Sequence, residues 1–186
     1  MNVMRQMNDN KEKVPYTSRL LHSVAVLAVA VTVGSLDQVS KWIAGSSLVP
    51  ERAVEIIPGF LNLQLRANPH GAFGLFANLP DEMRLPVLLA LSVIAIFAIV
   101  TFSIRTLGWS MAISVSLGLI LGGALSNLAD RAFRGEVMDF IDVYIAKVGH
   151  WPTFNLADMT ITVGSLLLVA ALYKSWRRRA AEESEP

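Results

Sequence analysis

The sequence contains no cysteine among its 186 residues. Disulfide bonds, thiol nucleophiles and metal sites built on cysteine are therefore excluded. Histidine is scarce as well, and His22, His70 and His150 show no H-E-x-x-H pattern or other metal-ligand spacing. Charged residues make up only 17% of the chain and nearly cancel, to a net charge of +1. This balance gives no sign of a nucleic-acid partner, and none is predicted.

Apolar residues are abundant by contrast. They make up 53% of the chain, and the mean hydropathy of +0.49 is too high for an ordinary soluble domain of this size. Four apolar runs are long enough to cross about 30 Å of hydrocarbon as helices. The sequence thus predicts a mainly α membrane fold in one domain, residues 1–186, with spans at residues 20–42, 85–104, 107–128 and 154–173. The first run is expected to be retained, because no convincing A-x-A cleavage site follows it.

Lysine and arginine gather at both ends of the chain and in the short connection that contains Arg105. By the positive-inside rule, both termini and this connection are expected in the cytoplasm, with tails at residues 1–19 and 174–186. Four spans then place residues 43–84 and 129–153 on the outer side. There, residues 53–57 and the alternating residues 61–66 flank a Pro58-Gly59 turn signal and predict a small sheet on the membrane surface.

Ionisable groups collect where the spans meet the outer side. Asp37 and Lys41 stand four residues apart, so one helical face can hold both as an ion pair. The other carboxylates of this region are Asp130, Asp139, Asp142 and Asp158. Because a charged side chain costs about 2.5–3.5 kcal/mol at the centre of a membrane helix, these groups are functional candidates. The small residues at four-residue steps from Ser110 to Ser126 are typical of close helix packing.

Paired carboxylates explain this acidic cluster best. Two aspartates held close together share one proton, so one can activate a water while the other protonates the carbonyl or the leaving amine. The residues alone do not choose the pair. Asp158 is favoured because it lies inside an apolar run, whereas Asp130 beside Arg131 suits a structural salt bridge and Asp142 is expected to face water. An all-carboxylate Mg²⁺ or Ca²⁺ site remains an alternative, and no Ser-x-x-Lys pair supports a serine nucleophile.

Four blocks in order along the chain sharpen this interpretation. They are Asp37–Lys41, Gly122–Arg131, Val137–Phe140 and Phe154–Asp158. These blocks resemble those of the bacterial lipoprotein signal peptidases, also called signal peptidase II, and the resemblance covers about residues 20–173. The second block is similar to the family's G-G-A-x-G-N-x-x-D-R pattern, with Ser126 in place of the usual glycine.

The resemblance implies a membrane aspartic endopeptidase of the bacterial inner membrane, with its active site on the periplasmic or outer side. The implied substrate is a diacylglyceryl-modified prolipoprotein, cut N-terminal to the lipidated cysteine within membrane lipid. Globomycin-like cyclic peptides would inhibit it, and no cofactor or metal is implied. Asp139 and Asp158 would form the catalytic dyad, and residues 137–148 an amphipathic loop over the site. Supporting or substrate-binding roles would fall to Asp37, Lys41, Asn68, Gly122, Asn127, Asp130, Arg131 and Asn155.

One block departs from the family pattern. The N-x-G-A-A-F pattern appears as Asn68–Phe73, with His70 where glycine is expected, so either Gly71 serves in a shifted turn or His70 alters the pocket. Two rival interpretations stay open: a four-span protein that binds or transports a cation or proton, and an inactive relative of the peptidases. The first needs polar groups along the spans, and residues 85–104 carry none beyond Ser and Thr.

Overall fold

The computed structural model describes residues 15–50, 52–71, 74–106, 108, 110–146 and 148–182. Its long helices are α2 (Tyr16–Ser47), α3 (Asp81–Thr106), α4 (Met111–Arg134) and α5 (Leu156–Glu182). Its strands are β1 (Val54–Ile57), β2 (Leu61–Asn68), β3 (Val137–Ile145) and β4 (Gly149–His150). The predicted tail up to residue 14, residues 72–73 of the His70 block and residues 183–186 lie outside the described residues.

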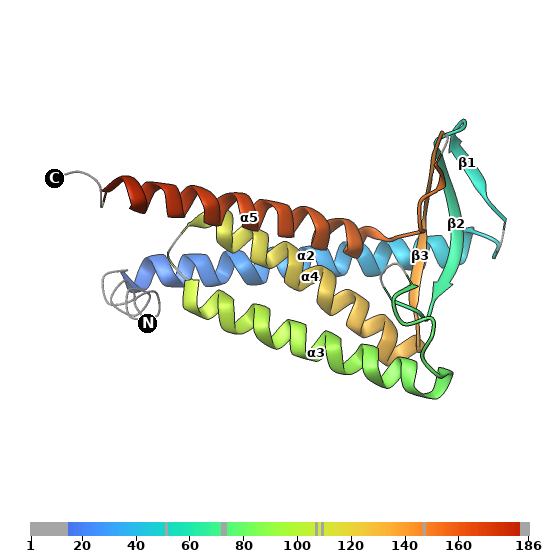
Figure 1. The fold of residues 1–186 in the computed structure, drawn as a ribbon, viewed down its shortest axis with the longest axis horizontal. Coiled ribbons are helices and arrows are strands. Elements are labelled where there is room, and N and C mark those ends of the chain that lie inside the picture. The colour runs from blue at the N-terminus through green and yellow to red at the C-terminus, as the bar shows by residue number, and fades with distance from the viewer. Residues whose placement is uncertain are drawn as a thin grey trace.

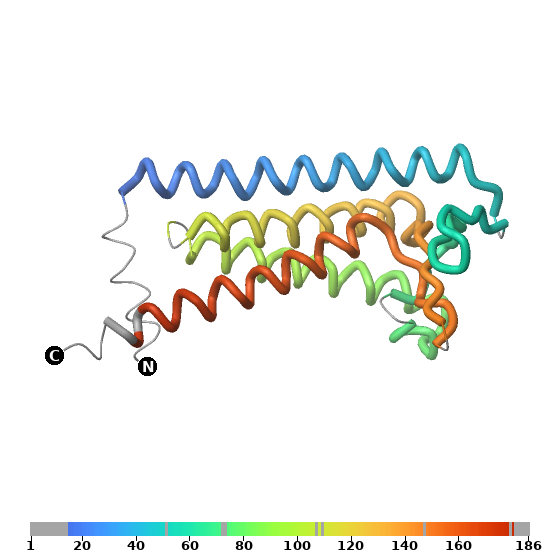
Figure 2. Tube along the Cα trace, turned by 90° about the horizontal axis from the view of Figure 1, so that it is seen from above, coloured from blue at the N-terminus to red at the C-terminus, as the bar shows by residue number. Residues whose placement is uncertain are grey.

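The four helices run along one long axis, and the sheet lies across one end of the bundle (Figure 1). α2 begins and α5 ends at the opposite end, as both views show (Figures 1 and 2). Each of the four is long and apolar enough to cross a membrane. The predicted four-helix membrane fold with a small sheet is therefore confirmed, and the polar blocks lie at the end of the bundle that carries the sheet.

α4 is the central helix, because it packs against α2, α3 and α5. Its glycines allow this contact. A Cβ on Gly122 would lie 2.6 Å from the carbonyl oxygen of Ala30 on α2, and a Cβ on Gly123 would lie 2.6 Å from that of Ala157 on α5. Small residues at such positions let helix backbones approach closely in lipid. Ser114 contributes differently, because its hydroxyl lies 2.9 Å from Nδ1 of the buried His22.

The sheet is antiparallel and has the order β1-β2-β3-β4. The prediction of a loop over residues 137–148 is wrong for most of that segment, because β3 pairs with β2 in a register that sets Asn68 opposite Val137. Asp142 is also not water-facing: it is 2% exposed, and its carboxylate accepts a hydrogen bond from Asn62 Nδ2 at 3.0 Å. The alternation typical of a strand was not recognised in β3, because the buried Asp139 and Asp142 occupy positions where apolar side chains are expected.

The turn after β2 explains the departure at His70. Gly71 is buried and has φ +74°, a left-handed conformation that side chains disfavour. A Cβ there would also lie 2.9 Å from a methyl group of Leu88. The backbone N–H of His70 donates to Asn68 Oδ1 at 3.2 Å, which holds the start of the turn. The residue that must be glycine is thus Gly71, one position after the place the family pattern suggests.

Candidate active site

The start of α5 fixes Asp158 by reciprocal hydrogen bonds. The Asn155 side-chain oxygen accepts from the Asp158 backbone N–H at 2.9 Å, and the Asp158 carboxylate accepts from the Asn155 backbone N–H at 3.3 Å. This is a capping-box arrangement, which satisfies two backbone donors of the first helical turn. A third donor, the N–H of Ala157, meets Asp37 Oδ1 at 2.8 Å. Asp158 itself is half-buried.

Asp139 lies on β3 and is fully buried. Asn155 Nδ2 donates to its Oδ1 at 2.7 Å, and Asn68 Nδ2 donates to its Oδ2 at 2.8 Å. Burial raises the pKa of the Asp139 carboxyl to about 7, and the negative charge of Asp158 acts in the same direction. The hydrogen bonds from the two Asn side chains and the charge of Lys41 lower the pKa by smaller amounts. Asp139 is therefore poised to hold a proton near neutral pH.

The orientation of Asn127 follows from its neighbours. Lys41 Nζ donates to Asn127 Oδ1 at 3.0 Å, and a lysine ammonium can only donate. The amide oxygen of Asn127 must therefore face Lys41, which turns its Nδ2 toward Asp158 Oδ1 at 2.8 Å. Asn155 Nδ2 approaches the same Asn127 oxygen at 3.3 Å. Asn127 thus links Lys41 to the carboxylate of Asp158. It also contacts Asn155, whose side-chain amide holds Asp139.

A buried charge network supports these amides. Lys41 is fully buried, and its Nζ lies 2.6 Å from both Asp37 Oδ2 and Asp130 Oδ2. Arg134 Nη1 lies 2.9 Å from Asp130 Oδ1, so two cations balance two carboxylates. The predicted ion pair of Asp37 and Lys41 is confirmed. Asp130 is a salt-bridged carboxylate as expected, but its partners are Lys41 and Arg134 and not the neighbouring Arg131. Such a network is costly to build but strongly destabilising to break, because removing one partner leaves a buried charge uncompensated.

The two remaining predicted site residues differ in what they can contribute. Gly122 lies in the contact between α2 and α4 and has no side chain to offer, so its contribution is close packing. Arg131 Nη1 makes only long contacts of 3.4 Å, to Ser92 Oγ and to the Asn127 carbonyl. Its buried Nε has no hydrogen-bond partner among the described residues. The Arg131 guanidinium is therefore held only weakly by the described residues.

Two contacts of the site were missed by sequence reasoning. Gln38 Nε2 donates to Asp130 Oδ1 at 3.0 Å, and the Ser126 hydroxyl donates to Asp37 Oδ2 at 2.6 Å. Ser126, the residue in place of the usual glycine, thus stabilises the buried carboxylate of Asp37. Gln38 lies in the block Asp37–Lys41 and Ser126 in the block Gly122–Arg131. Their position inside these blocks was the one sign in the sequence that they belong to the site. Among the described residues, no three acidic or histidine side chains gather as a metal-ligand set.

The fold and the site together define a multi-pass membrane protein with two aspartates joined through one asparagine at one end of its helix bundle. The family model described as signal peptidase (SPase) II matches residues 29–174. A lipoprotein signal peptidase of Aquifex aeolicus (strain VF5) is 43% identical over 143 residues, which cover 77% of this chain and 82% of the relative. One from Staphylococcus aureus (strain MRSA252) is 32% identical over 157 residues, covering 84% and 93%.

Solved structures agree with this family. A bacterial membrane enzyme determined by the in meso method at 2.3 Å resolution superposes with a TM-score of 0.71 at 33% identity, covering 80% of this chain and 87% of the other. A second, at 1.9 Å resolution, gives a TM-score of 0.70 at 33% identity, covering 79% and 91%. The chain belongs to the signal peptidase II family of membrane proteases. Membership does not favour the alternative of a cation- or proton-binding protein.

Proposed function

We propose that this chain removes the signal peptide from diacylglyceryl-modified prolipoproteins, with Asp139 and Asp158 as its catalytic dyad. The observation that supports this assignment best is the bridge through Asn155. Its side chain donates to Asp139 while its backbone N–H donates to Asp158, so one residue holds both carboxylates in a fixed relation. Other carboxylates do not fit as well, because Asp37 and Asp130 are committed to Lys41.

The raised pKa of Asp139 suggests how the pair divides its work. With a pKa of about 7, Asp139 carries the shared proton below neutral pH and donates it to the scissile carbonyl oxygen. Asp158, which is half-buried, takes the part of the ionised member and accepts a proton from the attacking water. The tetrahedral intermediate then collapses: Asp158 gives its proton to the leaving amine, and Asp139 takes a proton back from a hydroxyl of the intermediate, which becomes the new carboxyl group. No covalent intermediate with the chain is formed. Arg131, whose Nη1 makes only long contacts within the chain, is assigned to hold a substrate carbonyl beside the pair.

The bundle also suggests how the substrate is presented. The signal helix of the substrate lies among the spans, and the acyl chains on its lipidated cysteine stay in lipid. The scissile bond then reaches the end of the bundle that carries the sheet. With the termini in the cytoplasm and the chain in the bacterial inner membrane, this end faces the periplasm or outer side. Globomycin-like cyclic peptides, which imitate such a substrate, are expected to occupy the same site.

The test is cleavage of a diacylated prolipoprotein by the detergent-purified chain, with mass spectrometry of both products. The expected product begins at the lipidated cysteine. The matched substrate is the same sequence without the diacylglyceryl group, which is expected to be cut far more slowly. Equal cleavage of the two, or cleavage away from the lipidated cysteine, would contradict the proposed specificity. Absence of any cleavage by a folded sample would reject the proposed function.

A further inference from the structure

A groove between α4 and α5 lies outside the active site. It has a volume of about 460 Å³, and the side chains that line it are mainly small or apolar. They include Ala112 and Val115 near the start of α4, and Leu167, Ala170 and Ala171 on α5. This is the end of the bundle where α5 ends, opposite the sheet (Figure 1). A volume in this range, about 300–1,000 Å³, is typical of ligand sites, and this lining suits a hydrocarbon chain.

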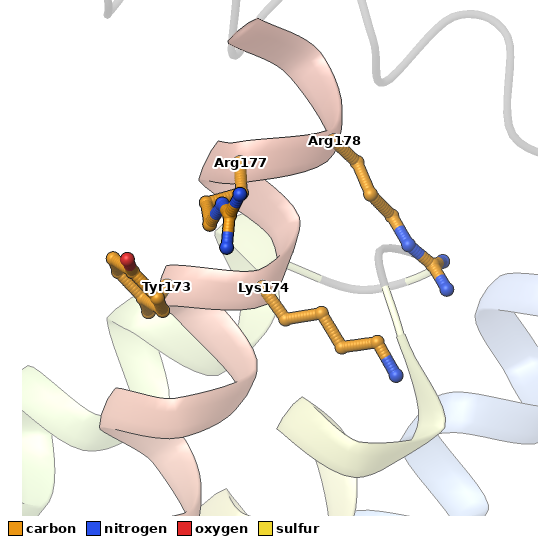
Figure 3. Close-up of a pocket in the computed structure, with 4 residues that line it drawn as sticks. All are labelled: Tyr173, Lys174, Arg177 and Arg178. Carbon is orange, nitrogen blue, oxygen red and sulfur yellow. The ribbon is translucent and has the colours of Figure 1, made fainter. Parts of the chain in front are cut away.

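A second, basic hollow shares a lining residue with the groove. Lys174 lines the groove and also lines this hollow, of about 490 Å³, together with Tyr173, Arg177 and Arg178. Figure 3 shows Lys174 and Arg178 extending to the same side of α5, while Tyr173 points to the other side. The apolar groove and the cationic hollow thus share one lining residue, Lys174.

These cations have no carboxylate partner in the described part of the chain. The salt bridges found there involve neither Lys174 nor Arg177 nor Arg178. Tyr173 and Trp176 form an exposed aromatic pair beside them, with ring centroids 6.1 Å apart. Exposed aromatic residues of this kind mark the level of lipid headgroups. The candidate span of α5 ends at Arg178, so the hollow lies at the membrane surface.

We propose that the groove and the hollow form one binding site for an anionic phospholipid. The lipid phosphate lies between Lys174 and Arg178, and one acyl chain lies along Ala170 and Ala171 toward α4. Charge complementarity favours an anionic headgroup, because the hollow presents several cations and no acid. The apolar groove favours a lipid over free phosphate. Basic residues at a helix end also act as a topology signal, but that role needs no groove.

The test is native mass spectrometry of the full-length, detergent-purified chain, titrated with phosphatidylglycerol or phosphatidylcholine of identical acyl chains. The charge variant is Lys174→Gln with Arg178→Gln, and the matched control is Arg105→Gln at the end of α3. Each cation near an anionic headgroup contributes roughly a factor of five. The double variant is therefore expected to bind phosphatidylglycerol about 30-fold more weakly. The control is expected to bind it as the unchanged chain does.

A substitution in the groove distinguishes a specific lipid-binding site from general attraction of anionic lipids to the basic surface. Ala170→Leu fills the groove without changing any charge, so it is expected to weaken binding of both lipids. Inorganic phosphate, as a third probe, is expected to bind far more weakly than either lipid. The proposal is overturned if Arg105→Gln weakens phosphatidylglycerol binding as much as the double variant does. It is also overturned if Ala170→Leu has no effect, if the two lipids bind equally, or if phosphate alone binds as tightly.

Discussion

Replacing Lys41 with methionine tests the buried charge network. Methionine keeps a similar length and volume but removes the ammonium group. In the unchanged chain that group lies 2.6 Å from both Asp37 Oδ2 and Asp130 Oδ2, and all three side chains are almost completely buried. The substitution therefore leaves two buried carboxylates without their shared cation. Asp130 keeps the salt bridge to Arg134, whereas Asp37 keeps only hydrogen bonds from neutral donors.

The size of the effect follows from this geometry. Removing one partner of a buried ion pair costs about 3–5 kcal/mol, because the other charge stays buried and unpaired. For a chain of this length, that loss lowers the unfolding temperature by roughly 6–20 °C. Turnover is also expected to fall, because Asn127 loses the donor that fixes its amide orientation toward Asp158.

The assay is thermal unfolding in detergent of four proteins: the unchanged chain, Lys41→Met, Asp37→Asn, and the double variant that combines both changes. The double variant also removes the charge of Asp37, one of the two buried carboxylates that lose their shared cation. It is therefore expected to be more stable than the sum of the two single losses predicts, by roughly 0.5–3 kcal/mol, the usual coupling energy of neighbouring residues. If Lys41→Met unfolds at the temperature of the unchanged chain, the network does not stabilise the fold. If the double variant is weaker by the simple sum of both changes, the charges are not coupled.

Three further outcomes are expected. The value of kcat/KM should fall as pH rises through about 7, because Asp139 then loses the shared proton; a flat profile across neutral pH would contradict this. Asn68→Ala removes a hydrogen bond that lowers the pKa of Asp139, so this alkaline limb should move to higher pH, and an unmoved limb would exclude the contact. Gly123→Ala places a Cβ 2.6 Å from the Ala157 carbonyl oxygen and should destabilise the chain by about 1–3 kcal/mol in thermal unfolding. An unchanged unfolding temperature would show that α5 moves away without cost.

Local patterns in the sequence were sufficient for the helices and for half of the sheet. Apolar runs of spanning length predicted all four helices, and period-two alternation over residues 61–66 predicted most of the strand Leu61–Asn68. β3 was missed, because two acids, Asp139 and Asp142, interrupt the alternation expected of a strand with one apolar face. Both acids are buried through side-chain partners on other elements, and a local pattern contains no information about those partners.

The candidate site likewise combines contacts that local spacing predicts with contacts that it does not. The spacing of Asp37 and Lys41 predicted an ion pair, since four residues along a helix bring two side chains together. The third member, Asp130, comes from another helix, and no local spacing relates it to Lys41. The hydrogen bond from Asn68 to Asp139 likewise joins residues 71 positions apart. Such contacts exist only once α2, α4 and the sheet have packed together, so the blocks indicated which residues matter but not how they connect.

The central claim is that Asp139 and Asp158 together activate the water that cuts the substrate. Its most direct measurement is the cleavage rate of a diacylated prolipoprotein by Asp139→Asn and by Asp158→Asn, each confirmed as folded. The exposed Asp81→Asn serves as the matched control. Each dyad variant is expected to lose roughly 10²–10⁴-fold in rate, and the control nothing. Normal cleavage by either dyad variant would contradict the assignment, and if Asp130→Asn were inactive at the same time, a different pair of carboxylates would carry the reaction.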